Sequence, residues 1–173
     1  MRAWTPAVRK VRLMDDMTPQ SITADDEGAV LALNNAHAVE LSWLEIDRLT
    51  RLVGWAFHAR RIGRLEAFLI AFDETSGYDG GHFQWFRARY PRFVYVDRVV
   101  VDPAARGRGH ARRLYLDLFD HARRGGHDIV TCEVNAEPPN PASDAFHAAM
   151  GFAPVGSASH DGKTVRYFVH RLG

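Results

Sequence analysis

One continuous segment constrains the fold of this chain more than any other. Residues 93–101 (FVYVDRVVV) form an almost unbroken run of β-branched and aromatic residues, which is typical of a buried strand. Pro103 and the glycines of ARGRGH follow at once, and residues 111–122 then carry apolar side chains at helical spacing until Gly125. The sequence therefore predicts a buried strand, a glycine loop and a helix in direct succession.

That succession suits the binding of an anion. The first turn of a helix has N–H groups without intrahelical partners and a partial positive charge, and glycines let the backbone approach a phosphate closely. Arg106, Arg108 and Arg112 add positive charge around the loop, although such arginines can also form a solvated helix face. The loop matches neither the Gly-x4-Gly-Lys-Ser/Thr pattern of a nucleotide P-loop nor the Gly-x-Gly-x-x-Gly pattern of a dinucleotide fold.

The sequence as a whole predicts a single domain over residues 1–173, without an internal repeat or a linker. We expect helices at 24–38 and 44–53, each preceded by a capping-box pattern, Thr23 with Asp26 and Ser42 with Glu45. Residues 73–92 show no clean period and are expected to form a long loop. The remaining expected elements are a strand around Val8, Val11 and Leu13, a hairpin over 55–72, a strand at 129–134, a helix at 143–150 and a hairpin over 155–172.

Composition narrows the class of protein. The chain has 173 residues, and its 22 basic and 21 acidic side chains give a net charge of +1, which argues against nucleic acid or an anionic membrane as a partner. No apolar run reaches the ~20 residues of a membrane span, and the amino terminus lacks the features of a signal peptide. The single cysteine, Cys132, cannot form an internal disulfide, and the histidines show no metal-ligand spacing. We therefore expect a cytoplasmic protein without a metal site.

Three motifs carry a resemblance to a known family. The glycine loop reads Arg106-x-x-Gly109-x-Ala111 after Val-x-Val-x-Pro, Asn135 follows a strand in CEVN, and residues 143–152 (SDAFHAAMGF) form a late helix with a Gly-Phe ending. With the order of elements over essentially the whole chain, these motifs resemble the GNAT superfamily of acyl-CoA-dependent N-acyltransferases. The resemblance implies an α/β (α+β) fold: a mixed, mostly antiparallel, twisted sheet of about seven strands with flanking helices, splayed between strands 4 and 5.

The resemblance also implies acetyl-CoA as the cosubstrate. Backbone groups of Val99 and Val101 would bind the pantetheine arm, residues 106–111 would wrap the pyrophosphate, and Arg112 would assist. Asn135 would bind the pantetheine region or the entering amine, and Ser143 would contact the cofactor from the late helix. The implied acetyl-CoA contacts are Val99, Val100, Val101, Arg106, Gly107, Arg108, Gly109, His110, Ala111, Arg112, Asn135 and Ser143.

The catalytic groups follow from the same resemblance. Members of the superfamily often place a tyrosine four residues before the glycine that ends the late helix, to protonate the departing CoA thiolate, and this chain has His147 there. A histidine of pKa ~6.5 can perform that step near neutral pH; the alternative is a polar residue that only closes the helix against the cofactor. For the general base, Asp97 and Glu133 lie on the two strands that splay, and the alternative for each is a simple salt bridge. A solvent water could also serve as the base if the bound amine is already partly neutral. A nucleophilic role for Cys132 is not expected.

The acceptor pocket is expected between the early helices and the connection before strand 4. Its candidates are Asn34, Asn35, Glu40, Tyr78 and Trp85. The aromatic loop over 73–92 would cover the acceptor, or its rings would pack on the sheet or form a dimer contact.

The leading function is an N-acetyltransferase that transfers an acetyl group from acetyl-CoA to a primary amine of a small molecule or amino acid, directly in a ternary complex. The alternatives are a protein acetyltransferase for lysine or N-terminal amines, and a non-catalytic acyl-CoA-binding or sensor domain. Dimers are common in the superfamily, so a homodimer is compatible with the resemblance, but no residue in the sequence indicates an interface.

Overall fold

The computed structural model describes residues 17–160 and 162–173, and within them the strands form one seven-stranded sheet. The strands are β1 (Gln20–Ser21), β2 (His58–Ile62), β3 (Ala67–Asp73), β4 (Val94–Val101), β5 (Ile129–Glu137), β6 (Ala153–His160) and β7 (Lys163–Arg171). The helices are α2 (Glu27–Ala36), α3 (Ile46–Trp55), α4 (Gly81–Arg87), α5 (His110–Arg124) and α6 (Pro141–Ala149), with short 3-10 turns η1 (Ala24–Asp26) and η2 (Pro103–Ala105). The strand expected around Val8, Val11 and Leu13 lies outside the described residues.

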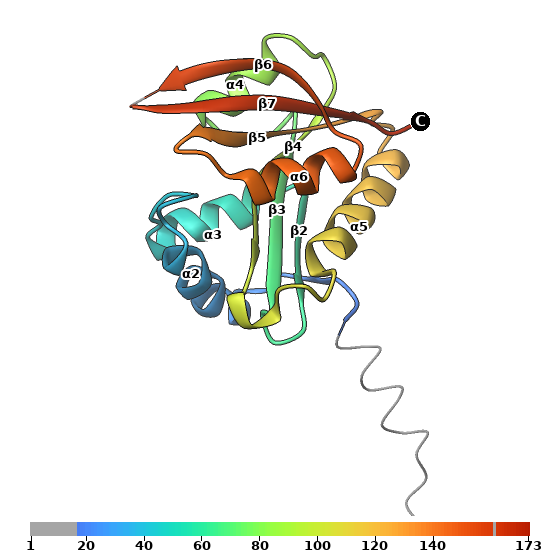
Figure 1. The fold of residues 1–173 in the computed structure, drawn as a ribbon. Helices are drawn as coiled ribbons and strands as arrows, with labels where there is room; N and C mark the ends of the chain where they lie inside the picture. Colours follow the sequence, from blue (N-terminus) through green and yellow to red (C-terminus); the bar gives the residue numbers. More distant parts are fainter. Residues whose placement is uncertain (1–16, 161) are drawn as a thin grey trace, which may run out of the picture.

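The sheet has the order β1-β2-β3-β4-β5-β7-β6, and every neighbouring pair is antiparallel except β4 and β5. This confirms the expected mixed, mostly antiparallel sheet with flanking helices (Figure 1). Both predicted hairpins are present as β2–β3 and β6–β7. Gly162 in the second hairpin turn has a φ of 75°, a backbone conformation that glycine adopts without strain.

The sheet opens between β4 and β5 because the two strands pair only briefly. Their register joins Val94 to Val130 and Tyr95 to Thr131, at the start of each strand. On the other edge of β4, Ile70 of β3 pairs with Arg98 while Ala71 pairs with Val96, so Asp97 is the extra residue of a β-bulge. A bulge bends its strand and increases the local twist. The expected splay between strands 4 and 5 is confirmed, and it begins at this bulge.

Hydrophobic layers cover both faces of the sheet. On one face, helices α2, α3 and α4 pack on inward side chains such as Phe68, Phe72 and Tyr167. On the other face, α5 packs with Leu114 and Leu118 against the alternate side chains of the same strands, and α6 lies beside it (Figure 1). Strands whose two faces are both buried read as near-continuous apolar runs, which explains why 93–101 stands out in the sequence.

Two local features differ from the sequence predictions. Residues 73–92 were expected to form a loop, but they include the short helix α4, which begins after Gly80 and buries Phe83 and Phe86 against the sheet. The capping box of Ser42 and Glu45 does not form, because Glu45 is itself the first flanking residue of α3 and its carboxylate accepts a hydrogen bond from the indole of Trp43 at 2.9 Å. The other predicted box forms, with the Asp26 carboxylate accepting from the Thr23 N–H at 2.9 Å.

Within the described part of the chain, no helix is both long enough and apolar enough to span a membrane. In the same residues, no group of three or more histidine, cysteine or acidic side chains is placed to hold a metal ion.

Candidate functional site

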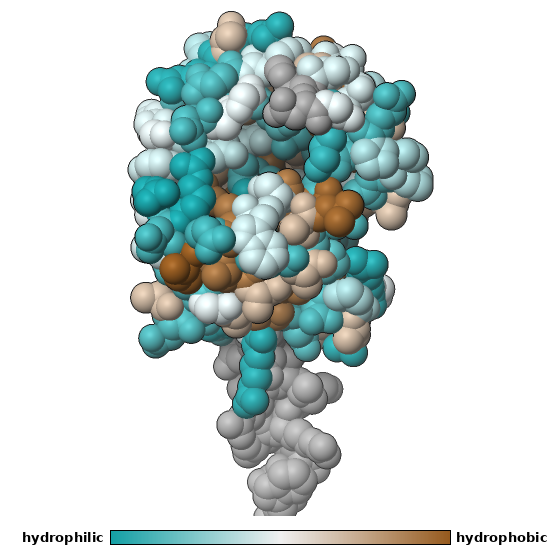
Figure 2. All heavy atoms as spheres, turned by 90° about the vertical axis from the view of Figure 1, so that its left-hand side faces the viewer, coloured by the Kyte–Doolittle hydropathy of each residue, from teal (hydrophilic) through white to brown (hydrophobic). Residues whose placement is uncertain are grey.

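A cleft of about 800 Å³ occupies the splay between β4 and β5. Its walls are the diverging strands, the start of α5, the inner side of α6 and the connection after α2. On the α2 and α3 side of the molecule, hydrophobic side chains gather across the middle of the surface, below a hollow (Figure 2). Val39 and Trp43 are 77% and 65% exposed on the connection between these helices. His37, Glu40 and Leu41 of the same connection line the cleft, so these exposed side chains lie beside it.

One end of the cleft is the predicted glycine loop. The Asp102 carboxylate accepts a hydrogen bond from the Ala104 N–H at 2.8 Å and thereby closes the turn η2. Gly107 and Gly109 have φ values of 76° and 77°, in the left-handed region that side chains other than glycine rarely adopt. Helix α5 begins directly after Gly109, so its first-turn N–H groups and partial positive charge lie at the cleft. This is an anion-binding arrangement.

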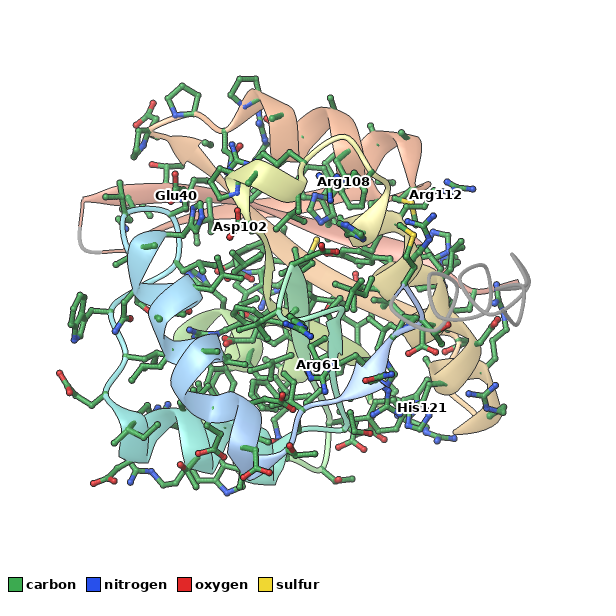
Figure 3. All side chains as sticks on the ribbon, turned by 90° about the horizontal axis from the view of Figure 1, so that it is seen from below. Glu40, Arg61, Asp102, Arg108, Arg112 and His121 are labelled. Atoms are coloured by element: carbon green, nitrogen blue, oxygen red, sulfur yellow. The ribbon has the colours of Figure 1, made fainter. Side chains whose placement is uncertain are left out.

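The charged side chains of this loop divide into two groups. Arg106 and Arg112 line the cleft, and Arg112 also approaches Met150, with 3.6 Å between Nη1 and Sδ. Arg108 instead lies 3.7 Å from Glu66, and the buried ring of His110 lies 3.3 Å from the same carboxylate. Arg108 and Arg112 are labelled in Figure 3. Sequence reasoning missed Glu66, which lies in the β2–β3 turn and anchors the loop from more than forty positions away in sequence.

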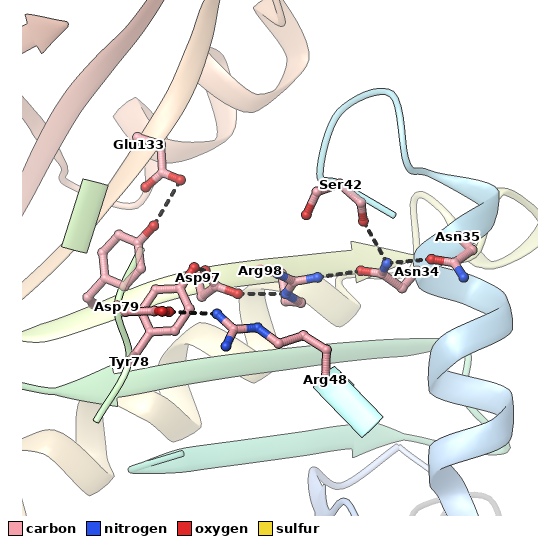
Figure 4. Close-up of polar contacts among 10 residues, drawn as sticks. Asn34, Asn35, Ser42, Arg48, Tyr78, Asp79, Asp97, Arg98 and Glu133 are labelled. Atoms are coloured by element: carbon pink, nitrogen blue, oxygen red, sulfur yellow. Dashed lines mark hydrogen bonds and ion pairs between the residues drawn. The ribbon is translucent and has the colours of Figure 1, made fainter. Parts of the chain in front are cut away.

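Two carboxylates, Asp97 and Glu133, line the cleft with different surroundings (Figure 4). The Tyr95 hydroxyl donates to Glu133 Oε1 at 2.9 Å, whereas Glu133 Oε2 is buried without a hydrogen-bond partner among the described residues. Burial, and then the negative charge of Asp97, raise the pKa of Glu133 to about 8. Glu133 therefore has an unused oxygen and a proton affinity close to neutral pH.

Asp97 has both of its oxygens engaged. The Tyr78 hydroxyl donates to Oδ1 at 2.6 Å, and Arg98 Nε donates to Oδ2 at 2.6 Å. The Asp97 and Arg98 side chains are only 5% and 6% exposed. Asp97 thus belongs to a buried ion pair, which is the alternative that the sequence left open for it.

Asn34 and Asn35, expected at the acceptor site, form structural hydrogen bonds outside the cleft walls. Asn34 accepts from Arg98 Nη1 at 2.8 Å and donates to the Ser42 carbonyl at 3.0 Å. Asn35 accepts from the Leu44 N–H and donates to the Leu44 carbonyl, both at 2.9 Å. Together they attach the connection between α2 and α3 to the sheet (Figure 4).

Glu40 and Asn135 do line the cleft, and they contact each other across it. Asn135 Nδ2 donates to the Glu40 carbonyl at 3.3 Å, which brings the connection after α2 to β5. Tyr78 and Trp85 do not line the cleft. Tyr78 stacks on Phe72 with 4.4 Å between ring centroids, and Trp85 stacks on Tyr167 at 4.1 Å. Their rings pack on the sheet, the alternative left open for the aromatic segment.

The opposite wall carries Ser143 and His147 of α6 and Tyr115 of α5. His147 Nδ1 lies 2.7 Å from the Ser143 carbonyl and 3.2 Å from its hydroxyl, and Nε2 lies 2.7 Å from the Tyr115 hydroxyl. Burial lowers the pKa of His147 below its usual 6.5. Tyr115 was not identified from the sequence, since at its position in α5 it reads as one more apolar residue of the buried face.

Cys132 also lines the cleft, but its side chain is buried and burial raises the pKa of its thiol well above the usual value. A thiol that holds its proton in this way is a poor nucleophile.

The sequence is similar to those of known acetyltransferases. The profile described as the Acetyltransferase (GNAT) family matches residues 32–152. An L-2,4-diaminobutyric acid acetyltransferase of Wolinella succinogenes is 30% identical over 82 residues, covering 47% of each chain. The N-alpha-acetyltransferase RimI of Mycobacterium tuberculosis is 44% identical over 69 residues, covering 39% of this chain and 40% of RimI. The matches thus span less than half the length of these two relatives.

Solved structures share the fold. The ribosomal-protein-S18-alanine N-acetyltransferase of Escherichia coli has a TM-score of 0.66 at 19% identity, over 90% of this chain and 93% of that one. YncA of Salmonella typhimurium, solved with its cofactor acetyl-CoA, has a TM-score of 0.64 at 21% identity, over 90% and 94%. Because the family profile matches well over half of the sequence and the sheet is splayed between strands 4 and 5, the chain belongs to the GNAT family of acetyltransferases.

Proposed function

We propose that this protein transfers an acetyl group from acetyl-CoA to a primary amine of a small molecule or amino acid, directly in a ternary complex. The observation that carries the proposal is the cleft itself. It has an anion-binding loop and, on its β5 wall, a buried carboxylate oxygen of Glu133 that has no hydrogen-bond partner among the described residues.

The residues around the loop fit the phosphates of acetyl-CoA. The left-handed glycines Gly107 and Gly109 expose the N–H groups of the loop, and Arg106 and Arg112 add charge at its mouth. The edge of β4 from Val99 to Val101 lines the cleft beyond the last residue pair with β5, so its backbone groups are available to the pantetheine arm. Bound acetyl-CoA supplies the activated thioester carbonyl.

Glu133 is the residue we assign as the general base. An alkyl amine is an ammonium ion at neutral pH, with a pKa of ~10.4, and it must lose a proton before its nitrogen can attack. Glu133 Oε2 is free to accept that proton, and a carboxyl pKa of about 8 matches the task better than an ordinary glutamate. Asp97 is occupied by Arg98 and Tyr78, so we assign it a positioning role: its charge helps raise the pKa of Glu133.

Backbone N–H groups near Val99 stabilise the negative charge that develops on the carbonyl oxygen, since such a role needs no particular side chain. On the opposite wall, the side chains of Tyr115, Ser143 and His147 carry exchangeable protons.

The similarity to RimI supports a second candidate, acetylation of a protein amine. The exposed Val39 and Trp43 flank Glu40 at the cleft and would give a polypeptide an apolar surface to lie on. The similarity to a diaminobutyric acid acetyltransferase supports the first candidate.

Calorimetric titration with acetyl-CoA, with CoA and ATP as controls, tests the cofactor. Thiol release then tests the acceptor on 2,4-diaminobutyrate, an alkyl diamine and a peptide with a free N-terminal amine. Turnover with the small amines and none with the peptide is the expected result. The reverse pattern selects the protein acceptor, and acetyl-CoA binding without turnover on any amine selects a sensor domain.

A further inference from the structure

Tyr95 lies at the point where the sheet begins to open. It is the last residue of β4 in register with β5, where it pairs with Thr131, and Glu133 follows two residues later along β5. Side chains alternate along a strand, so Thr131 and Glu133 project to the same face of the sheet. Tyr95 projects to that face too, since Glu133 pairs with Tyr167 of β7 and both tyrosines belong to the layer under α2, α3 and α4. The Tyr95 side chain therefore reaches across the opening to the carboxyl group.

The hydroxyl of Tyr95 engages one oxygen of Glu133 and not the other. It donates to Oε1 at 2.9 Å, and in the part of the chain that the structure describes it is the one side-chain group that hydrogen-bonds this carboxyl. Tyr95 is 1% exposed, and the rings of Phe83 and Phe86 lie against it, with centroids 5.7 and 5.9 Å away. A ring packed in this way keeps its hydroxyl in one place, so Oε2 is the oxygen left for a ligand of the cleft.

We propose that Tyr95 is the positioning residue of the general base, because its hydroxyl holds Glu133 Oε1 and leaves Oε2 to take the proton of the acceptor amine. This inference rests on the proposed acetyl transfer. In the step concerned, an N–H bond of the bound ammonium ion breaks, its electron pair stays on nitrogen, and an O–H bond forms on Oε2. The neutral amine then attacks the thioester carbon, and the proton on Oε2 passes to solvent after the product leaves.

The hydroxyl also favours the charged form of the base. A hydrogen bond donated to a carboxylate lowers its pKa, so Tyr95 opposes the burial that, together with Asp97, raises the pKa of Glu133 to about 8. Among the described residues, the charged groups that face Glu133 are Asp97 and Arg98 of β4, which form an ion pair with each other. The other titratable side chains that face it keep their protons because burial raises the pKa of each: Tyr78, Tyr115, Cys132 and Tyr167.

The first test measures the titration of the Glu133 carboxyl and needs neither acceptor nor acetyl-CoA. Glutamate labelled at its side-chain carboxyl carbon is incorporated for carbon NMR, and Glu133→Gln identifies the resonance by its loss. Tyr95→Phe keeps the ring and removes the hydroxyl, so the carboxyl should titrate about one pH unit higher than in wild type. Tyr167→Phe is the matched control, because Tyr167 is also buried and pairs with Glu133, but its hydroxyl lies 2.9 Å from His82 Nδ1.

The second test measures the pH dependence of turnover, with the amine of the panel above that wild type acetylates fastest. The rising limb of kcat/KM for the amine should move to higher pH in Tyr95→Phe by the same amount as the carboxyl titration. Above that limb, kcat should still be about 10-fold lower, because the carboxylate is no longer held in one orientation. The KM for acetyl-CoA should change by less than about three-fold, and Tyr167→Phe should keep the wild-type limb.

The outcomes separate the inference from the function beneath it. Absence of turnover by wild type on every amine of the panel overturns the acetyl transfer and the inference with it. Turnover by wild type with the same carboxyl titration in wild type and Tyr95→Phe overturns the inference alone. An equal shift of the titration in Tyr167→Phe also overturns it, because general packing would then set the pKa, and so does a shift that the pH–rate limb does not follow. Shifts of both the titration and the limb that are confined to Tyr95→Phe support the inference.

Discussion

At the residue scale, the two cleft carboxylates show how far surroundings decide chemistry. Asp97 and Glu133 lie on adjacent strands and both look like salt-bridge partners in the sequence. Asp97 receives hydrogen bonds on both oxygens, whereas Glu133 receives one from Tyr95 and keeps Oε2 free. A buried ionised oxygen without a partner is costly, so the protein holds the proton of Glu133 to higher pH.

The raised pKa of Glu133 predicts a pH-dependent stability difference. A carboxyl group whose pKa is raised from 4.5 to about 8 by folding contributes stability that is fully present below about pH 4.5 and is lost as pH rises through 8. Glu133→Gln carries no proton to lose. We expect equal unfolding free energies at pH 4, and at pH 9 a variant more stable than wild type by on the order of a few kcal/mol. Urea unfolding at both pH values measures this, and coincident curves of wild type and variant at pH 9 would contradict the raised pKa.

The same carboxyl predicts a pH–rate profile. If Glu133 is the base, kcat/KM for the amine should rise with pH up to about 8, where the free enzyme loses this proton. Glu133→Gln should lower kcat by roughly 100-fold and remove that limb of the profile. If the rise of kcat/KM with pH persists unchanged in the variant, the group that titrates is the amine and not Glu133.

The buried pair of Asp97 and Arg98 predicts a large structural cost. Asp97→Asn leaves the Arg98 guanidinium buried without its carboxylate, which costs about 3 kcal/mol or more of unfolding free energy. Asp79→Asn is the control, because it breaks an ion pair with Arg48 in which the aspartate is 75% exposed, and such pairs contribute less than about 1 kcal/mol. Similar losses of unfolding free energy in the two variants would show that burial does not set how much the Asp97–Arg98 ion pair contributes to stability.

At the scale of elements, the loop before α5 joins a strand end to a helix start in a conformation that depends on glycine. Asp102 closes its first turn, and Glu66 holds its far side through Arg108 and His110. The loop is thus shaped before any ligand arrives, which lowers the ordering cost of binding.

A side chain at Gly109 should abolish that binding. Gly109→Glu forces a left-handed conformation on a residue with a Cβ and adds a negative charge at the anion site. We expect the Kd for acetyl-CoA to rise at least ~100-fold by calorimetry. Gly54→Glu is the control for charge, since a Cβ at Gly54 meets open space on α3. Unchanged affinity in Gly109→Glu would remove the loop from the cofactor site.

Helix α4 illustrates an element whose role is packing. Trp85 lies between the ring of Tyr167 and the Arg89 guanidinium, which is 3.8 Å from the indole centroid. Trp85→Ala should therefore lower the unfolding free energy by about 2 kcal/mol or more and leave the KM for the amine unchanged. A raised KM for the amine at unchanged stability would instead return this helix to the acceptor site.

At the scale of the whole molecule, the cleft exists because two hydrophobic layers hold the halves of a split sheet. The layer under α2, α3 and α4 crosses from β3 and β4 to β7, and the layer under α5 does the same on the other face. These two layers fix the positions of β4 and β5 relative to each other although the strands no longer pair. The gap between the strands therefore stays open for a ligand.

A ligand that fills this gap should stabilise the entire fold. At a concentration 100 times its Kd, acetyl-CoA adds about 2.7 kcal/mol, which raises the Tm by about 5 °C or more for a domain of this size. Thermal unfolding with acetyl-CoA, and with ATP at the same concentration, measures the effect. An equal rise with ATP would indicate a general phosphate site rather than a fitted cleft.

Much of the architecture follows from local sequence patterns. The strand at 93–101, the loop that begins at Pro103 and the helix up to Gly125 are each visible because burial on two faces, glycine conformation and helical periodicity act over a few neighbouring residues. The order of the strands and helices, and the motifs that resemble the GNAT superfamily, are properties of the same kind. Helix α4 was not predicted because it is short and its aromatic residues do not alternate with polar residues at helical spacing. It is held by the packing of those aromatic rings on the sheet.

The tertiary structure decided which side chains meet. Glu66 anchors a loop far along the chain, Tyr115 of α5 meets His147 of α6, and Glu133 has a free oxygen where Asp97 has none. These facts depend on distances between segments that are remote in sequence, and on a burial that no single segment determines. The sequence by itself thus determined the scaffold and the anion loop, because both rest on local physics. The assignment of proton-transfer groups depended on the packed molecule, because proton affinity responds to neighbours that only folding brings together.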